Sequence, residues 1–313
     1  MKPLKHPIVT LVGPTASGKT DVAQQVALRM DGEVVSADSM QIYRGMDIGT
    51  GKLPASERMV PHWGFDLVDP GAPYSAALFQ TYARNAFEDI DGRGKRAVLC
   101  GGTGLYVRAA IDDYEFPAGE QVENPVRQRW TAYAEEHGTD ALWEQLRQRD
   151  PESAAVVHPH NVRRVVRAFE LLAEGKSYAQ QKENLATIKP FCPAVQFGLA
   201  VDPALLAERI NRRVDAMVEA GLVDEVQALL AEGFREGVTA PQAIGYKEIV
   251  DALEGRCTMD EAIERVKQAT RRYAKRQRTW FRRDARIHWL DADAFDAERL
   301  AEEIISQLET LDC

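Results

Sequence analysis

The chain has 313 residues, of which 45% are hydrophobic and 28% charged, a composition typical of a globular protein of about two domains. Its apolar runs are far shorter than the ~20 residues that cross a bilayer, and no apolar signal core follows the N-terminus, so we expect a cytoplasmic protein without a membrane span. The net charge of −9 argues mildly against nucleic-acid binding, and the four cysteines form no CxxC pair that would indicate a zinc knuckle or a disulfide framework.

The first third of the chain alternates between strands and helices. Residues 8–12 form an apolar, β-branched run, and a helix is expected from Lys19 to about Met30. Further strands are expected at 33–37 and 97–100. Because such alternation is typical of a parallel sheet with crossover helices, we expect an α/β fold.

The middle of the chain differs in character. From about Glu120 to Pro193 it has few strand signals and many helix formers, which predicts an inserted all-helical domain at 119–193. The core would then consist of residues 1–118 and 194–313.

The last third returns to the core pattern. A strand is expected at 196–201, and Asp202 is a natural N-cap for one helix that runs from Pro203 to about Glu232. The capping box at 258–261 predicts another long helix that ends near Phe281.

A phosphate-binding motif follows the first strand and opens the first helix, which is the context that confirms a P-loop match. Its residues fit GxxxxGK[ST] and are Gly13, Pro14, Thr15, Ala16, Ser17, Gly18, Lys19 and Thr20. We expect backbone N–H groups and the helix N-terminus to bind phosphate oxygens, Lys19 to reach the outer phosphate, and the Thr20 hydroxyl to hold Mg²⁺. ATP is the commonest occupant of such a loop. No acidic residue ends the strand at 97–100, which weakens an ATPase interpretation.

Asp38 falls at the expected end of the second strand, on the edge where open α/β sheets bind ligands. Two roles are open for it, metal support through water and general base. A turn or N-cap aspartate is the alternative.

Five blocks in order resemble the bacterial tRNA dimethylallyltransferase family, from about Ile8 to Arg283. They are residues 38–52, 101–106, 213–217 with 221–226, 243–248 and 275–280. Two positions depart from the family pattern, Gly51 in place of alanine and His160-Asn161 in place of Asn-Asp. Neither departure touches the chemistry that the resemblance implies.

The resemblance implies a P-loop NTPase-like fold and a Mg²⁺-dependent transferase. The P-loop would bind dimethylallyl diphosphate rather than ATP, and Arg213 would add positive charge at its leaving group. The acceptor would be the exocyclic amine of the adenosine on the 3′ side of a tRNA anticodon. Asp38 would remove its proton, and Thr103 would orient the amine or the diphosphate.

An adenine in the anticodon loop must be flipped out to reach such a pocket. Ser39, Met40 and Gln41 adjoin Asp38 and would read the flipped base. The resemblance places further tRNA contacts at Arg163, Arg164, Val165, Val166, Arg167, Gly245, Lys247, Lys275, Arg276, Arg278 and Arg282. A solvated charged helix face is the alternative for the first arginines. We expect a monomer.

Residues 271–286 carry eight basic residues and one acidic residue, a local charge of +7 in an acidic protein. Basic residues with Tyr273, Trp280 and Phe281 between them suit phosphate contact and base stacking, although core packing is favoured for Trp280 and Phe281.

Three other functions share some of these features. A small-molecule P-loop kinase would not need the two basic clusters. A prenyltransferase of free adenine nucleotides would not need the inserted domain. A non-catalytic RNA-binding protein would not need intact Lys19, Thr20 and Asp38.

Overall fold

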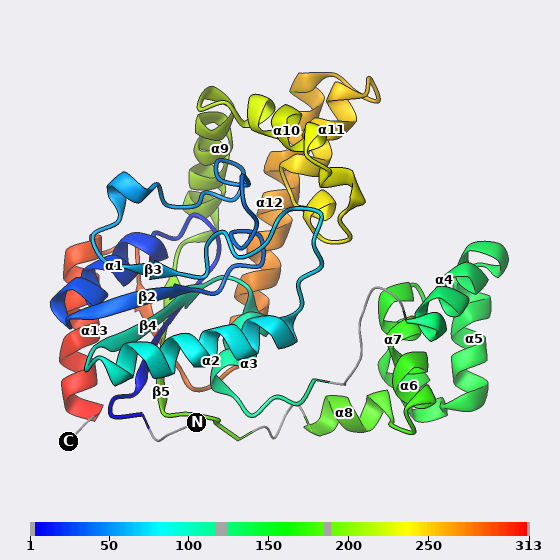
Figure 1. The fold of residues 1–313 in the computed structure, drawn as a ribbon, viewed down its shortest axis with the longest axis horizontal. Helices are drawn as coiled ribbons and strands as arrows, with labels where there is room; N and C mark the ends of the chain where they lie inside the picture. The colour runs from blue at the N-terminus through cyan, green and yellow to red at the C-terminus, as the bar shows by residue number, and fades with distance from the viewer. Residues whose placement is uncertain (1–3, 117–123, 185–188, 312–313) are drawn as a thin grey trace. The chain divides into compact units, whose positions relative to one another are not determined.

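The computed structural model describes residues 4–116, 124–184 and 189–311. The chain divides into two compact units, residues 1–112 with 190–313, here called the sheet unit, and residues 113–189, here called the helical unit (Figure 1). The predicted junction at 118–119 lies outside the described residues. Within the sheet unit Asp112 and Pro190 form an antiparallel bridge, and in the helical unit the Asp113 N–H donates to the Lys189 carbonyl at 2.9 Å.

The sheet unit contains a six-stranded sheet in the order β3-β2-β4-β1-β5-β6, and every pairing is parallel. The strands are β1 (Ile8–Val12), β2 (Gly32–Ser36), β3 (His62–Trp63), β4 (Arg96–Gly101), β5 (Ala194–Ala200) and β6 (Ile287–Asp291). The α/β fold and four of these strands are confirmed as predicted. The edge strands β3 and β6 were not predicted.

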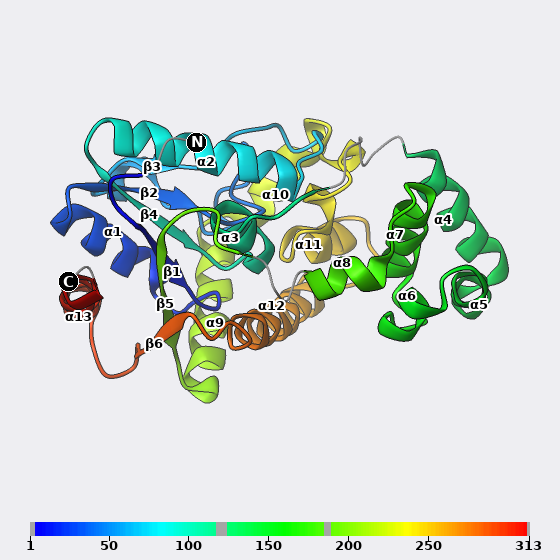
Figure 2. The ribbon, with the colours of Figure 1, turned by 90° about the horizontal axis from the view of Figure 1, so that it is seen from below.

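Helices cover both faces of the sheet, because successive side chains of a strand point to opposite faces. Val9 and Leu11 of β1 pack in a core with α1 (Lys19–Arg29) and α13 (Ala297–Leu311). Ile8 and Val12 pack in the opposite core, with α2 (Ala76–Gly92) and α3 (Gly104–Ile111). Figure 2 shows α2 and α1 on the two sides of the sheet.

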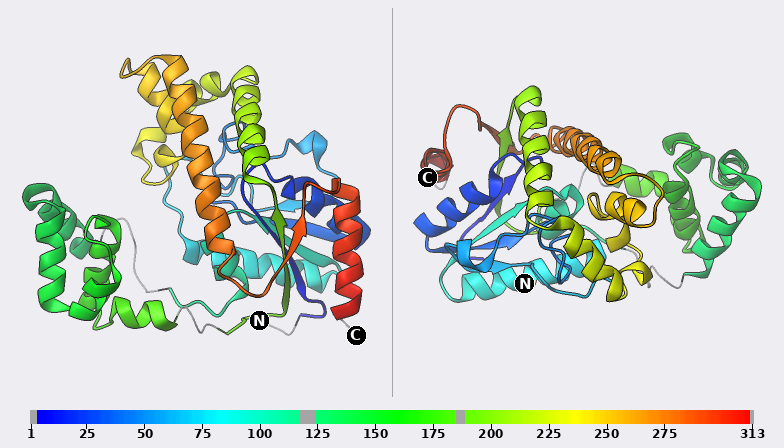
Figure 3. Two further views of the ribbon diagram at one scale, coloured as in Figure 1. Left: turned by 180° about the vertical axis from the view of Figure 1, so that it is seen from behind. Right: turned by 90° about the horizontal axis from the view of Figure 1, so that it is seen from above.

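Beyond the carboxyl ends of the strands lie α9 (Pro203–Glu219), α10 (Leu222–Ala231), α11 (Tyr246–Leu253) and α12 (Met259–Phe281). Here α9 packs beside α12 (Figure 3). The predicted single helix from Pro203 to Glu232 is wrong. Gly221 has φ +100°, a left-handed conformation that ends α9 and starts α10. The predicted capping box is confirmed, since Thr258 and Glu261 bond each other's backbone N–H groups.

The helical unit contains, among the residues described, α4 (Pro125–His137), α5 (Thr139–Arg149), α6 (Pro151–Val156), α7 (Val162–Ala173) and α8 (Tyr178–Asn184). Its core includes Trp130 stacked on Phe169, with ring centroids 3.8 Å apart. Within the described ranges no helix has both the length and the apolar character of a membrane span.

Candidate active site

The P-loop connects β1 to α1 at the carboxyl edge of the sheet. The Lys19 Nζ donates to the Pro14 carbonyl at 3.2 Å, so the lysine folds back over the loop. The Ser17 hydroxyl is buried, and no hydrogen-bond partner for it occurs in the part of the chain that the structure describes. A buried hydroxyl without a partner is costly in a protein interior, so this atom fits a loop that is completed by a ligand.

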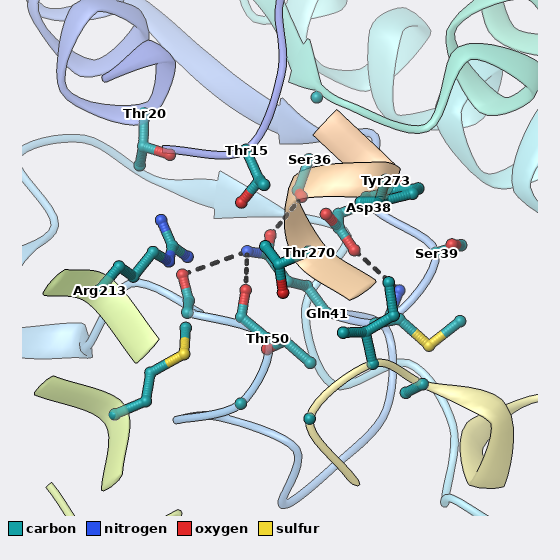
Figure 4. Close-up of a pocket in the computed structure, with 18 of the residues that line it drawn as sticks. Thr15, Thr20, Ser36, Asp38, Ser39, Gln41, Thr50, Arg213, Thr270 and Tyr273 are labelled. Atoms are coloured by element: carbon teal, nitrogen blue, oxygen red, sulfur yellow. Dashed lines mark hydrogen bonds between the residues drawn. The ribbon is translucent and has the colours of Figure 1, made fainter. Parts of the chain in front are cut away.

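A cavity of about 330 Å³ opens beside this loop. Lys19 and Thr20 line it from α1, Asp38 from the loop after β2, and Arg213 from α9. Figure 4 shows Thr20 and Arg213 on one side of the cavity and Asp38 with Tyr273 on the other. The structure therefore brings the three predicted catalytic and phosphate-binding charges into one cavity.

Lys19, Arg213 and the exposed Arg276 line the cavity, and the first two are desolvated. Within the described residues neither Lys19 nor Arg213 has a carboxylate oxygen within 4.0 Å, while many surface arginines do. Burial lowers the pKa of Lys19, and the nearby Arg213 lowers it further. Burial also lowers the pKa of Arg213, and Asp38 opposes the shift in both. Two desolvated cations that face one cavity make a strong site for a polyanion.

Asp38 and Thr103 lie on two neighbouring loops that are bonded to each other. The Asp38 Oδ1 accepts from the Met40 N–H at 2.9 Å, which orients the carboxylate. The Thr103 Oγ1 accepts from the Ser39 N–H at 3.1 Å and donates to the Ser39 hydroxyl at 3.3 Å. Burial, reinforced by Asp38, raises the pKa of Tyr273 of α12 to about 12, and Thr103 opposes the shift.

The glycines around Thr103 are explained by close neighbours rather than by turn geometry. A Cβ on Gly102 would collide with the side-chain amide of Gln277, and one on Gly104 with the indole of Trp280. A Cβ on Gly101 would collide with the Ala37 carbonyl. These contacts bring α12 and the loop after β2 tightly against the turn that carries Thr103.

Gln41 lines the cavity, but its amide is engaged by the protein. It accepts from the Ser36 hydroxyl at 2.8 Å and donates to the carbonyls of Thr50 and Gly51 at 3.3 Å each. Ser39 and Met40 also line the cavity. Gly51 lies against the guanidinium of Arg213, where a Cβ would collide with it. The departure at Gly51, expected not to touch the implied chemistry, therefore lies beside a residue to which the resemblance assigns a role in it.

The candidate tRNA residues of the helical unit differ in their exposure. Arg163 and Arg164 are exposed at the start of α7. Val165 and Val166 are buried in the core of the unit, so their placement on an RNA surface is corrected: they pack against the protein. Arg167 donates to Glu170 at 2.7 Å, and this glutamate is only 2% exposed.

The other candidate tRNA residues belong to the sheet unit. Lys275, Arg276 and Arg282 are exposed on or next to α12, Lys247 is exposed on α11, and Arg278 is partly buried. Arg276 and the buried Gly245 also line the cavity. Phe281 is buried as expected, but Trp280 is 40% exposed, so core packing was wrong for the tryptophan.

Sequence reasoning missed Glu225 as a structural residue of the site. Its carboxylate accepts the backbone N–H groups of Asp47, Ile48 and Gly49 at 2.7–3.1 Å, and the Tyr246 hydroxyl at 2.6 Å. We call this arrangement the Glu225 clamp. It holds the loop that continues into Thr50 and Gly51, beside Gln41 and Arg213. The sequence gives no spacing signal for it, because the partners lie far apart along the chain.

The sheet order, the P-loop and the paired cations define a P-loop α/β protein that binds a polyphosphate group beside a carboxylate. The family model described as IPP transferase matches residues 41–284, and one described as isopentenyl transferase matches residues 6–60. The chain belongs to the IPP transferase family.

Bacterial relatives match it over nearly their whole length. A tRNA dimethylallyltransferase of Carboxydothermus hydrogenoformans is 45% identical over 97% of this chain and 98% of its own. Among solved structures, the tRNA isopentenylpyrophosphate transferase of Bacillus halodurans is 42% identical, with a TM-score of 0.71 over 98% of each chain. A eukaryotic dimethylallyltransferase acting on tRNA is 30% identical, with a TM-score of 0.75 over 92% of this chain and 74% of its own.

Proposed function

We propose that this protein transfers a dimethylallyl group from dimethylallyl diphosphate to the exocyclic amine of the adenosine 3′-adjacent to the anticodon of a tRNA, releasing pyrophosphate. One observation carries the proposal: two unneutralised cations, Lys19 and Arg213, share a cavity with the carboxylate of Asp38. The cations suit the polyanionic leaving group of one substrate. The carboxylate suits the amine of the other substrate, which must lose a proton.

The leaving-group side stabilises charge that develops as the bond between the prenyl carbon and the diphosphate oxygen breaks. Lys19, Arg213 and the N–H groups of the P-loop face that charge, and fixed donors in a site of low dielectric stabilise a transition state strongly. The Ser17 hydroxyl gains a phosphate oxygen as its partner.

On the acceptor side a new bond joins the prenyl carbon to the amine nitrogen. The lone pair of an adenine amine is delocalised into the ring, so the amine is a weak nucleophile. The Asp38 carboxylate takes its proton as the bond forms. The Met40 N–H holds one carboxylate oxygen and leaves the other available. Thr103 lies on the neighbouring loop, where it orients the amine or the diphosphate.

The donor set fits Mg²⁺ held largely by the substrate. Thr20 lines the cavity, and no group of three or more His, Cys, Asp and Glu side chains suited to a metal occurs among the described residues. Mg²⁺ is commonly bound by one or two protein oxygens together with phosphates and water. Thr20 would hold it, and the ion would neutralise charge on the leaving group.

We further propose that the tRNA anticodon stem-loop contacts the exposed basic residues of α12 and of α7, and that the predicted inserted domain at 119–193 serves this binding. Arg276 supports this, because it is exposed and also lines the cavity. With tRNA as its substrate, the protein would act in the cytoplasm, as a monomer.

The test is to incubate the protein with Mg²⁺, dimethylallyl diphosphate and an unmodified tRNA that has adenosine after its anticodon, and then to analyse the nucleosides by mass spectrometry. A prenylated adenosine at that position is expected. Product with free AMP but not with tRNA would instead indicate a nucleotide prenyltransferase. ATP consumption without any prenylated product would indicate a kinase.

A further inference from the structure

Gln277 bridges the two loops that face the two substrates. It lies on α12, four residues after Tyr273 and therefore on the same helix face, and it is only 5% exposed. Its side-chain oxygen accepts from the Thr15 N–H of the P-loop at 2.9 Å. Its side-chain nitrogen donates to the Gly102 carbonyl at 2.9 Å.

This bridge requires the chemistry of a primary amide. Thr15 offers a donor and Gly102 an acceptor, so the residue between them must accept at one end and donate at the other. A glutamate carboxylate can only accept, and a methionine of similar shape can do neither well. Either substitution would leave a buried backbone group without its partner, which is unfavourable.

One of the two bridged loops faces the diphosphate, and the other faces the acceptor amine. Thr15 belongs to the loop that grips the leaving group, and Gly102 directly precedes Thr103, which is bonded to the loop after Asp38. The amide lies so close to Gly102 that a Cβ at this position would collide with it, so the bridge requires glycine there.

We propose that Gln277 is a positioning residue for prenyl transfer, which sets the distance between the diphosphate site and the acceptor site. The inference rests on the proposed function. Because a misplacement of about 1 Å between reacting groups can lower a rate ~100-fold, a residue that acts through the two loops it bridges can control the chemical step.

The experiment compares Gln277→Met and Gln277→Glu with the wild type and with Gln268→Met. Gln268 is an exposed glutamine on the same helix, and its replacement controls for a methionine in α12. For each protein we would measure the single-turnover rate of prenyl transfer, the Kd values for tRNA and inorganic pyrophosphate, and the melting temperature. We expect the rate of Gln277→Met to fall about 10- to 100-fold, with both Kd values within about threefold of the wild type.

A pH profile separates positioning from a general packing role. A protonated glutamic acid can accept at one oxygen and donate at the other, so it restores both bonds of the amide. The rate of Gln277→Glu, taken as a ratio to the wild type at each pH, should therefore rise as the pH falls. The ratio removes pH effects that are common to both proteins. The titratable and cationic groups that line the same cavity are Lys19, Asp38, His62, Cys100, Arg213, Tyr246, Tyr273 and Arg276.

The outcomes are distinguishable. If the wild type forms no prenylated tRNA, the proposed function fails before the role of Gln277 is in question. If the wild type is active and Gln277→Met stays within about threefold of it, Gln277 does not position the loops. A parallel loss of rate, both affinities and melting temperature, without recovery of Gln277→Glu at low pH, would also overturn the proposal.

Discussion

At the scale of single residues, the cations of the cavity that face the leaving group are not bonded to the carboxylate that faces the amine. Lys19 belongs to the P-loop, and Figure 4 shows Arg213 with Thr20 on one side of the cavity and Asp38 on the other. The residue after Asp38, Ser39, is bonded to Thr103. A transferase that expels a polyanion and deprotonates an amine needs this separation, because a carboxylate bonded directly to the two cations would neutralise them before the substrate arrives.

Replacing Asp38 by asparagine tests its role as the base. The amide keeps the shape of the side chain but cannot take a proton, so we expect the single-turnover rate to fall by ~10²–10⁴. The tRNA Kd, measured by filter binding, should stay nearly unchanged. Asp69→Asn, at an exposed aspartate that pairs with Arg44, is the control. A rate within a few fold of the wild type would exclude Asp38 as the base.

The lowered pKa of Lys19 predicts how diphosphate affinity depends on pH. The lysine is charged below its pKa, and burial together with Arg213 brings that pKa below the usual 10.5. The contribution of Lys19 to pyrophosphate affinity should therefore be lost as the pH rises through the lowered pKa, at a pH where an exposed lysine would remain charged.

Titration calorimetry between about pH 7 and pH 10 would measure this decline. Lys19→Ala should bind pyrophosphate more weakly at every pH and should lack this part of the decline. The protonation of pyrophosphate itself is common to both proteins and cancels in the comparison. Equal pH profiles for the two proteins would contradict the assignment.

At the scale of elements, the features that depend on neighbouring residues in the sequence were predicted correctly. Three such features lie next to a helix or strand in the sequence. They are the P-loop between β1 and α1, Asp38 just after β2, and the capping box at the start of α12. Edge strand β3 has only two residues, His62 and Trp63, and so offers no periodicity to detect. The break at Gly221 was missed because one glycine is also tolerated inside a helix.

Contacts between distant elements were beyond the reach of pattern reasoning. Gln277 and Glu225 bond to residues 262 and 176–178 positions away respectively. Both lie inside blocks that carry the family resemblance, but nothing in those blocks indicates these contacts. The one available signal was indirect. Gly102 and Gly104 do not have positive φ angles, so their lack of a side chain indicates a close neighbour.

The Glu225 clamp makes a prediction for the stability of the sheet unit. Glu225→Ala would leave three backbone N–H groups and the Tyr246 hydroxyl without their acceptor. We expect the free energy of unfolding, from urea denaturation, to fall by about 2 kcal/mol. Glu232→Ala, at an exposed glutamate beside the same helix, should change it little. Equal stabilities of the two variants would show that the clamp contributes nothing.

At the scale of the whole molecule, the acidic net charge hides a basic segment at 271–286. If tRNA phosphates contact this segment, binding must release counterions and depend steeply on salt. Arg276→Ala should weaken tRNA binding and reduce the slope of log K against log salt by about 1. Arg299→Ala on α13 is the control, and its slope should match the wild type. An unchanged slope for Arg276→Ala would remove α12 from the RNA surface.

The bridge between Asp112 and Pro190 has a consequence for the order of folding. The chain leaves the sheet unit and returns to it at paired residues, and Asp113 and Lys189 are bonded as well. Once the helical unit has formed its own core, the long segment that separates β4 from β5 acts as a short connection. The entropic cost of bringing β5 beside β1 then falls by roughly 2 kcal/mol. A chain synthesised from its N-terminus would thus complete the insertion before β5 pairs with β1. Phe169→Ala, which removes the stack on Trp130, should slow the recovery of pyrophosphate binding during refolding, although it lies outside the sheet unit.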